Sequence, residues 1–248
     1  MHVAGRRIAF RRTEGRGPAL IWLGGFRSDM LSTKAQILVD WAARNGRAMI
    51  RFDYSGHGES GGDFEQGTIS DWLEDALGVI REQGGEAPVL VGSSMGGWLA
   101  LLAARALAAE SRALSGLILI APAPDFTEDL MWNRFSAEIR AEILEKGVFR
   151  APSQYSPEPT PITRALVEDG RRHLLMNGLL RTYAPVRILQ GMQDPDVPWE
   201  HALRLVEHLA EDDVIVTLVK DGDHRLSRPE DLDLLVKAVE SLQSNLTY

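Results

Sequence analysis

Short apolar runs alternate with longer segments of helical periodicity along most of this chain. The apolar runs are ALIWL (19–23), AMIRFD (48–53), PVLVGSS (88–94), GLILIAPA (116–123), PVRILQGM (185–192) and VIVTLV (214–219). Helical patterns follow them at 34–46, 69–82, 95–109, 199–209 and 228–242. Strands that alternate with crossover helices build a mostly parallel sheet with helices on both faces. The sequence therefore predicts an α/β fold, with a further short strand at Ile8 and Phe10.

The alternation stops between Asp125 and Thr182. Residues 130–146 and 162–175 have helical patterns, no segment of this stretch reads as a strand, and the proline-rich spacer APSQYSPEPTP (151–161) separates the two helices. The strand and helix rhythm then resumes. We therefore expect one core formed by residues 1–124 and 183–248, with a helical cap at 125–182 inserted after the sixth strand.

Composition limits the partners and the compartment. A net charge of −8 argues against nucleic-acid binding, which normally uses a basic patch. The chain has no cysteine, which excludes disulfides, thiolate metal sites and a cysteine nucleophile. No apolar run is long enough to cross a bilayer, so no integral membrane association is expected. The start, MHVAGRRIAFRR, lacks the apolar core of a secretory signal. These features together favour a cytoplasmic protein.

A candidate nucleophile lies where the third of these apolar runs meets a helix. The stretch GSSMG (92–96) fits the pattern Gly-x-Ser-x-Gly only with Ser94 at its centre, because centring Ser93 would need glycines at 91 and 95. A serine on a tight strand-to-helix turn is the nucleophile elbow of serine hydrolases. The helix N-terminus that follows favours negative charge near the hydroxyl. The alternative interpretation is a glycine-serine turn that merely links a strand to a helix.

A serine hydroxyl needs a base to accept its proton and an acid to orient that base. His224 follows the last predicted strand, in a loop at the carboxyl edge where α/β sheets gather their active groups. Asp194 and Asp196 follow the preceding strand, and Asp194 comes first, beside a proline that stiffens the turn. We expect His224 as base and Asp194 as orienting acid. The other histidines lie at the N-terminus, in a glycine-rich loop or in predicted helices: His2, His57, His173, His201 and His208.

Two backbone N–H groups are expected to hold the developing oxyanion. One belongs to Met95, directly after the nucleophile, and the other to Phe26, after the strand that ends at Gly24 and Gly25. The turn RFDYSGHGES (51–60) is expected to be structural. It contains neither a complete dinucleotide fingerprint nor a P-loop, and the chain has no metal-ligand spacing, so neither a cofactor nor a metal is expected.

Six segments together are more specific than the serine motif alone: GFRSDM, IRFDYSGHGES, VGSSMGGWL, EKGVFRAPSQYS, LQGMQDPDVPW and DHRLSRPED. With them the chain resembles the α/β-hydrolase superfamily, in the branch of the mitochondrial palmitoyl-protein thioesterase, also known as mycophenolic acid acyl-glucuronide esterase, and its bacterial relatives. The resemblance implies an α/β-hydrolase fold, hydrolysis of acyl thioesters or esters, including depalmitoylation, and no cofactor. It implies Ser94 as nucleophile, Asp194 as acid and His224 as base.

The expected function is therefore a serine esterase or thioesterase that works through an acyl-serine intermediate. Its substrate would be a small acyl ester or thioester, or an acylated protein. Four apolar cap residues are candidates for the acyl channel, and ordinary cap packing explains them equally well: Met131, Trp132, Phe135 and Phe149. Carbon–carbon hydrolases and cofactor-free peroxidases use similar triads, and a non-catalytic binding protein on the same fold is a third alternative.

Overall fold

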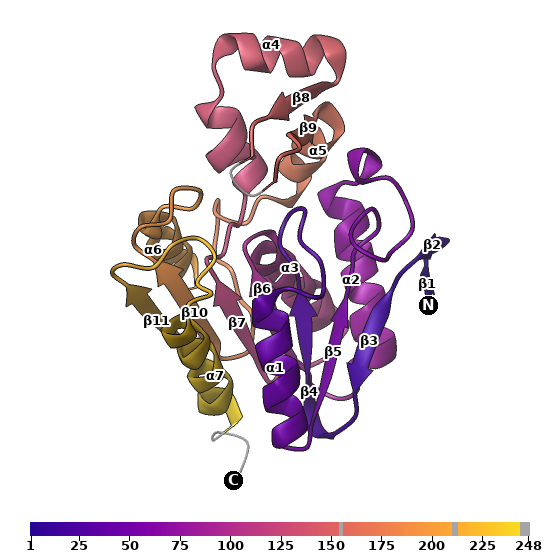
Figure 1. The fold of residues 1–248 in the computed structure, drawn as a ribbon, viewed down its shortest axis with the longest axis vertical. Coiled ribbons are helices and arrows are strands. Elements are labelled where there is room, and N and C mark those ends of the chain that lie inside the picture. The colour runs from indigo at the N-terminus through magenta and orange to yellow at the C-terminus, as the bar shows by residue number, and fades with distance from the viewer. Residues whose placement is uncertain (154–155, 210–212, 244–248) are drawn as a thin grey trace.

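The computed structural model describes residues 1–153, 156–209 and 213–243, so Gln154 and Tyr155 of the proline-rich spacer lie outside the described residues. Its centre is a seven-stranded sheet of order β11-β10-β7-β6-β4-β5-β3 (Figure 1). The strands are β3 (Phe10–Thr13), β4 (Arg16–Leu23), β5 (Arg47–Phe52), β6 (Val89–Ser93), β7 (Gly116–Ile120), β10 (Val186–Gly191) and β11 (Val214–Val219). Only β3 pairs antiparallel, with β5, and the other pairs are parallel.

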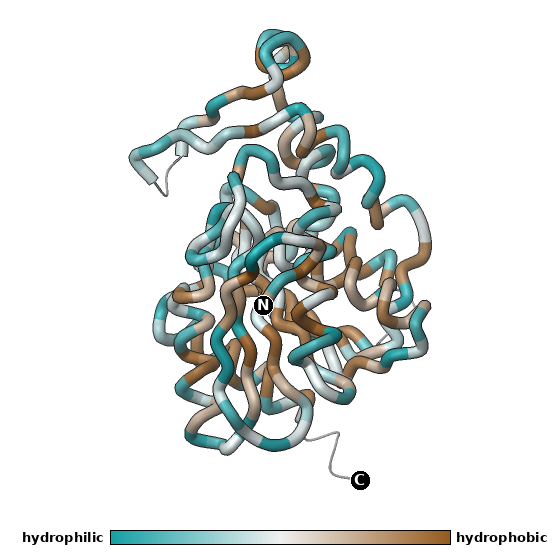
Figure 2. Tube along the Cα trace, turned by 90° about the vertical axis from the view of Figure 1, so that its right-hand side faces the viewer, coloured by the Kyte–Doolittle hydropathy of each residue, from teal (hydrophilic) through white to brown (hydrophobic). Residues whose placement is uncertain are grey.

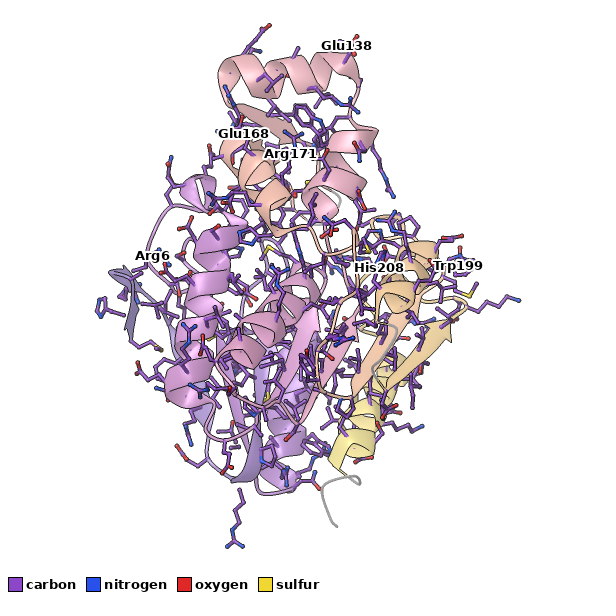
Figure 3. All side chains as sticks on the ribbon, turned by 180° about the vertical axis from the view of Figure 1, so that it is seen from behind. Arg6, Glu138, Glu168, Arg171, Trp199 and His208 are labelled. Carbon is purple, nitrogen blue, oxygen red and sulfur yellow. The ribbon has the colours of Figure 1, made fainter. Side chains whose placement is uncertain are left out.

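Helices cover both faces of this sheet. The helices α1 (Thr33–Arg44) and α7 (Pro229–Gln243) pack on one face, and α2 (Ile69–Gln83), α3 (Met95–Ala109) and α6 (Trp199–His208) pack on the other. Side chains of β4 alternate between the two layers: Leu20 and Trp22 face α1, whereas Ile21 and Leu23 face α2 and α3. Hydrophobic segments accordingly run through the interior of the main body in Figure 2. Trp199 and His208, labelled in Figure 3, mark the two ends of α6.

Local sequence signals set the helix ends. The side chain of Thr68 accepts a hydrogen bond from the N–H of Asp71, and the Asp71 carboxylate accepts from the N–H of Thr68, which forms a capping box at the start of α2. The side chains of Ser32 and Ser136 accept the N–H groups of Ala35 and Ile139 at the starts of α1 and α4 (Ala137–Lys146), each as a simple N-cap. Gly147 ends α4 with φ +82, a left-handed conformation that glycine adopts without strain. The predicted helix 95–109 coincides with α3, and 69–82 differs from α2 by one residue.

The cap lies over the carboxyl ends of the parallel strands (Figure 1). It contains α4, α5 (Arg164–Gly170) and an antiparallel pair of strands, β8 (Val148–Ala151) and β9 (Thr160–Thr163). Its base is closed by Asp125, whose carboxylate accepts hydrogen bonds from the N–H groups of Leu175 and Met176 at the other end of the insertion. No helix in the described part of the chain has the length and apolar character needed to span a bilayer.

Several predicted features of the cap and the N-terminus are wrong. The cap is not purely helical, because Ile162 of β9 joins the apolar cluster of Ile143 and Val167, a tertiary contact that favours a strand. The helix expected over 130–146 is broken before α4. The insertion follows β7, the fifth strand of the main sheet in chain order and not the sixth. The first two strands, β1 (His2–Val3) and β2 (Arg6–Arg7), pair only with each other, and Ile8 lies outside any strand.

Candidate active site

Ser94 occupies a strained turn between β6 and α3. Its backbone has φ +54 and ψ −117, a region that a residue with a side chain rarely adopts. The flanking glycines are required by space: a Cβ on Gly92 would lie 2.2 Å from the carbonyl oxygen of Gly96, and one on Gly96 would lie 2.1 Å from that of Leu23. The N–H of Ser94 donates to the carbonyl of Ile120 at 2.9 Å. The turn therefore holds the hydroxyl at the carboxyl edge of the sheet.

The structure brings Ser94, His224 and Asp194 together from three separate loops. The Oγ of Ser94 lies 3.1 Å from Nε2 of His224, and Nδ1 of His224 lies 2.7 Å from Oδ2 of Asp194. A carboxylate accepts hydrogen bonds only, so Nδ1 carries the hydrogen and Nε2 is left to accept from the serine hydroxyl. The side chain of Asp194 is fully buried and that of His224 is 16% exposed. This arrangement has the contacts that a nucleophile, a base and an orienting acid require.

Asp194 is fixed by its own turn. Its Oδ1 accepts the N–H groups of Asp196 and Val197 at 2.9 and 2.8 Å, and its Oδ2 accepts the side-chain amide of Gln190 at 3.3 Å. Asp194, Asp196 and His224 also offer ligand atoms within 4.8 Å of one another, which is a possible metal arrangement among the described residues. However, four hydrogen bonds already use the oxygens of Asp194. The donor set thus fits an oriented imidazole better than a metal ion.

Contacts of four charged residues hold the loop that carries His224. The buried ammonium group of Lys34, on α1, donates to the carbonyl of Arg225. Burial lowers the pKa of Lys34 to about 8. Asp223 accepts the N–H of Leu226 at 2.9 Å, and Asp221 pairs with Arg228 at 2.7 Å. Asp221 and Asp223 therefore shape this loop. No sequence pattern pointed to Lys34, a residue 190 positions away from His224 in the chain.

The two expected oxyanion donors belong to segments next to Ser94. Met95 is the first residue of α3, and Phe26 lies in the loop after β4. This loop runs close to the elbow, because a Cβ on Gly25 would lie 3.5 Å from the Cβ of Ser94. Within the described part of the chain, neither the N–H of Phe26 nor that of Met95 donates a hydrogen bond. Both groups are available to a negatively charged oxygen.

The turn at 51–60 supports the loop that carries Phe26. The carboxylate of Asp53 accepts the N–H groups of Met30 and Glu59 at 2.7 and 2.8 Å. His57 is buried, and its Nε2 accepts the N–H of Arg27 at 3.3 Å. Burial lowers the pKa of His57 to about 4, so the ring is neutral at neutral pH and can accept this bond. The turn is structural, as expected, but its specific link to the Phe26 loop was not foreseen.

A second serine–histidine contact lies between α2 and the cap. The Oγ of Ser70 lies 2.7 Å from Nε2 of His173, and Asp169 accepts the N–H and the hydroxyl of Ser70. Asp169 approaches the same ring nitrogen, Nε2, at 3.8 Å. No carboxylate therefore orients His173 from its far side among the described residues, as a catalytic base requires. We interpret this cluster as a cap for the first turn of α2.

The four candidate residues of the acyl channel pack mainly within the cap. The rings of Phe135 and Phe149 meet edge to face at 5.9 Å. The guanidinium carbons of Arg140 and Arg171 lie 5.6 and 4.8 Å from the ring centroid of Trp132 (Arg171 is labelled in Figure 3). All four contact the cap cluster around Ile143. Of the four, only Met131 also packs against the main core, as Phe26 does. Met131 is thus the candidate that links the cap to the oxyanion loop.

Comparison with known proteins assigns the chain to a family. The model of the alpha/beta hydrolase family matches residues 17–234. The chain belongs to the alpha/beta hydrolase family. The human relative, palmitoyl-protein thioesterase ABHD10, mitochondrial, is 35% identical over 97% of this chain and 78% of its own length. The expected resemblance to that branch is therefore confirmed.

Two solved structures show how far the similarity extends. The crystal structure of a putative hydrolase from Agrobacterium vitis S4 is 54% identical to this chain and superposes with a TM-score of 0.93. The match covers 96% of this chain and 93% of that one. The structure of alpha/beta hydrolase domain-containing protein 10 from mouse is 33% identical to this chain and superposes with a TM-score of 0.88. The match covers 98% of this chain and 96% of the mouse chain. The predicted α/β-hydrolase fold, with its mostly parallel sheet between helices, is thereby confirmed.

The names of the relatives correct one expectation. The ABHD10 relatives from human, orangutan and cow that match this chain are all named mitochondrial. The cytoplasmic assignment made from the composition and the start of the sequence is therefore wrong. Its physical basis was weak, because the absence of cysteine fits any compartment and carries no address.

Proposed function

We propose that this protein is a serine hydrolase that cleaves carboxylic thioesters or esters through an acyl-serine intermediate. The observation that carries the proposal is the continuous chain of contacts from Asp194 through His224 to Ser94, with distances of 2.7 and 3.1 Å. The relatives named palmitoyl-protein thioesterase support an acyl thioester as substrate, either a small molecule or an acylated protein. The reaction requires no cofactor.

In the first half of the proposed cycle, His224 takes the proton of Ser94 while the serine oxygen attacks the acyl carbonyl. The carbonyl oxygen becomes an oxyanion and accepts hydrogen bonds from the N–H groups of Phe26 and Met95. Each such donor contributes about 3–4 kcal/mol to transition-state stabilisation. The imidazolium then gives its proton to the leaving thiolate or alkoxide. Asp194 holds the ring and offsets its positive charge without taking the proton.

In the second half, water attacks the acyl-serine while His224 accepts a proton from that water. The bond between the acyl carbon and the serine oxygen then breaks, His224 returns the proton to the oxygen of Ser94, and the acid product leaves. The acyl group would lie under the cap, against Met131, which packs on both the cap cluster and the main core. Trp132, Phe135 and Phe149 would form the more distant wall of the same channel. An apolar wall favours an apolar acyl chain, because the chain leaves water on binding.

A fluorophosphonate probe tests the proposal, because it reacts with an activated serine. We expect mass spectrometry to find the label on Ser94, and we expect Ser94→Ala to abolish both labelling and hydrolysis of short p-nitrophenyl esters. Ser93→Ala is the matched control, since this neighbouring serine has no contact with His224 in the described structure. Labelling that survives in Ser94→Ala and disappears in Ser93→Ala would refute the assignment.

Substrate profiling separates the proposal from its rivals. Acyl thioesters and esters of graded chain length should be hydrolysed. The acyl chain length that the enzyme prefers then indicates the depth of the channel. Cleavage of a carbon–carbon bond in a dione, or halogenation with peroxide, in the absence of any ester or thioester hydrolysis would favour the alternative reactions. Folded protein that neither reacts with the probe nor hydrolyses any ester would indicate a non-catalytic binding protein.

A further inference from the structure

Arg27 has an unusual backbone conformation in the loop that carries the proposed oxyanion donor. The loop forms a turn closed by the N–H of Ser28, which donates to the carbonyl of Gly25 at 3.1 Å. Arg27 occupies the third position of this turn with φ +58. This position favours glycine or asparagine, because other side chains are strained there. An arginine in a conformation that suits glycine indicates that its side chain has a role elsewhere.

On the core side, Arg27 is held by His57. Its N–H donates to Nε2 of the neutral ring at 3.3 Å, and Nδ1 of that ring donates to the carbonyl of Ser55 at 3.2 Å. The ring of His57 is packed against the rings of Phe64 and Trp72, with centroids 5.0 and 5.1 Å away. These contacts leave His57 little freedom to move. The backbone of the loop is thus fixed directly after Phe26.

On the cap side, the guanidinium group of Arg27 reaches the start of β9. Its Nη1 donates to the carbonyl of Pro159 at 2.8 Å and to the hydroxyl of Thr160 at 3.3 Å. The carboxylate of Glu158 lies 3.6 Å from Nη2, although this acid is largely exposed to solvent. The guanidinium carbon lies 5.9 Å from the centroid of the Phe64 ring, and that ring also contacts the ring of Phe26 at 5.0 Å. One residue therefore contacts the cap hairpin, the supporting histidine and the oxyanion loop.

We propose that Arg27 is a positioning residue that couples closure of the cap to the alignment of the Phe26 N–H with the oxyanion. The inference rests on the proposed function and adds a residue that neither the serine motif at 92–96 nor the triad includes. When the cap hairpin accepts the guanidinium, the turn is held from both ends and the donor is preorganised. When the hairpin moves away, the strained turn loses one of its two supports. The oxyanion hole is thus complete only under a docked cap.

The hairpin offers a matched control, because a second arginine also links it to the core. Arg150 of β8 binds both carboxylate oxygens of Glu65 at 2.8 and 3.1 Å. This ion pair fixes the same hairpin, but neither of its residues contacts the loop from Gly25 to Ser28 among the described interactions. A general effect of cap mobility would appear in variants of both arginines. An effect on the oxyanion hole would appear only in variants of Arg27.

The experiment compares Arg27→Asn with Arg150→Gln on p-nitrophenyl acetate, whose short acyl group needs little of the cap. Asparagine tolerates the left-handed conformation, so the turn can persist while the side chain no longer reaches Pro159. We expect Arg27→Asn to lower kcat at least about tenfold, with KM within about twofold and an unchanged thermal midpoint, because a misplaced donor weakens only the transition state. The rate of fluorophosphonate labelling at Ser94 should fall in parallel. Arg150→Gln should retain kcat within about twofold.

Three results would overturn this inference. The first is a wild-type kcat in Arg27→Asn, and the second is an equal loss of kcat in Arg150→Gln. The third is a rise in KM with kcat unchanged, which would indicate that Arg27 only binds substrate. In each of these cases the wild-type protein still hydrolyses the ester and is labelled at Ser94, so the proposed function stands. A wild-type protein with neither activity nor labelling would refute the proposed function and this inference together.

Discussion

Acidification should unfold this protein in a way that depends on His57. In the folded state the ring is buried, and its Nε2 accepts the N–H of Arg27, which requires a neutral nitrogen. Burial lowers the pKa of this ring from 6.5 to about 4. In the unfolded chain the ring takes up a proton near pH 6.5. Between these values the unfolded state binds more protons, so the free energy of unfolding falls as the pH falls. With these two pKa values, the free energy of unfolding is about 2 kcal/mol lower at pH 5 than at neutral pH.

Urea unfolding at pH 7.5 and pH 5.0 measures this loss. Other groups also titrate in this range, so the wild-type protein is compared with His57→Gln, which lacks the titrating ring. We expect the wild-type protein to lose about 2 kcal/mol more than the variant between the two pH values. An equal loss in both proteins would refute the reasoning, since His57 would then titrate normally in the folded state. If the variant does not fold, an NMR titration of the His57 ring in the wild-type protein gives the same answer.

Three other changes have definite expected outcomes. Asp194→Asn should lower kcat by about 10³–10⁴-fold in steady-state ester hydrolysis while the far-ultraviolet circular dichroism stays the same, because the amide no longer selects the right tautomer of the catalytic ring. Gly96→Ala should lower the free energy of unfolding, measured in urea, by about 2–3 kcal/mol, because the added Cβ meets the carbonyl of Leu23. Gly178→Ala is the control: its added Cβ lies in open space, so the free energy of unfolding should change little. Because the pKa of Lys34 is lowered in the folded state, the unfolded chain binds more protons than the folded one between pH 8 and 10.5, so the free energy of unfolding rises with pH in this range. In urea titrations the wild-type protein should gain about 2 kcal/mol of unfolding free energy relative to Lys34→Met between pH 7.5 and pH 9.5. Equal changes with pH in the two proteins would contradict this.

Much of the core was predictable because its signals are local. Periodicity gave the bounds of α3, and it gave β10 and β11 to within one residue at each end. The pattern Gly-x-Ser-x-Gly pointed to Ser94 because the tight turn leaves no room for a side chain at either glycine. A Cβ on one glycine would meet backbone a few residues away, and a Cβ on the other would meet backbone of the adjacent strand. The cap was less predictable. Its β8 and β9 depend on Ile162 packing against Ile143 and Val167, and that contact has no periodic signal.

The sequence by itself determined the alternating elements, the elbow and the order in which serine, acid and histidine follow one another. It did so because helix and strand periods and steric limits act over neighbouring residues. The tertiary structure alone decided which groups support the site. Lys34 holds the loop of His224, and His57 and Arg27 hold the loop of Phe26. Such hydrogen bonds join residues that are 30 to 191 positions apart. Only the folded sheet, which gathers the carboxyl ends of its strands at one edge, brings them within reach of each other.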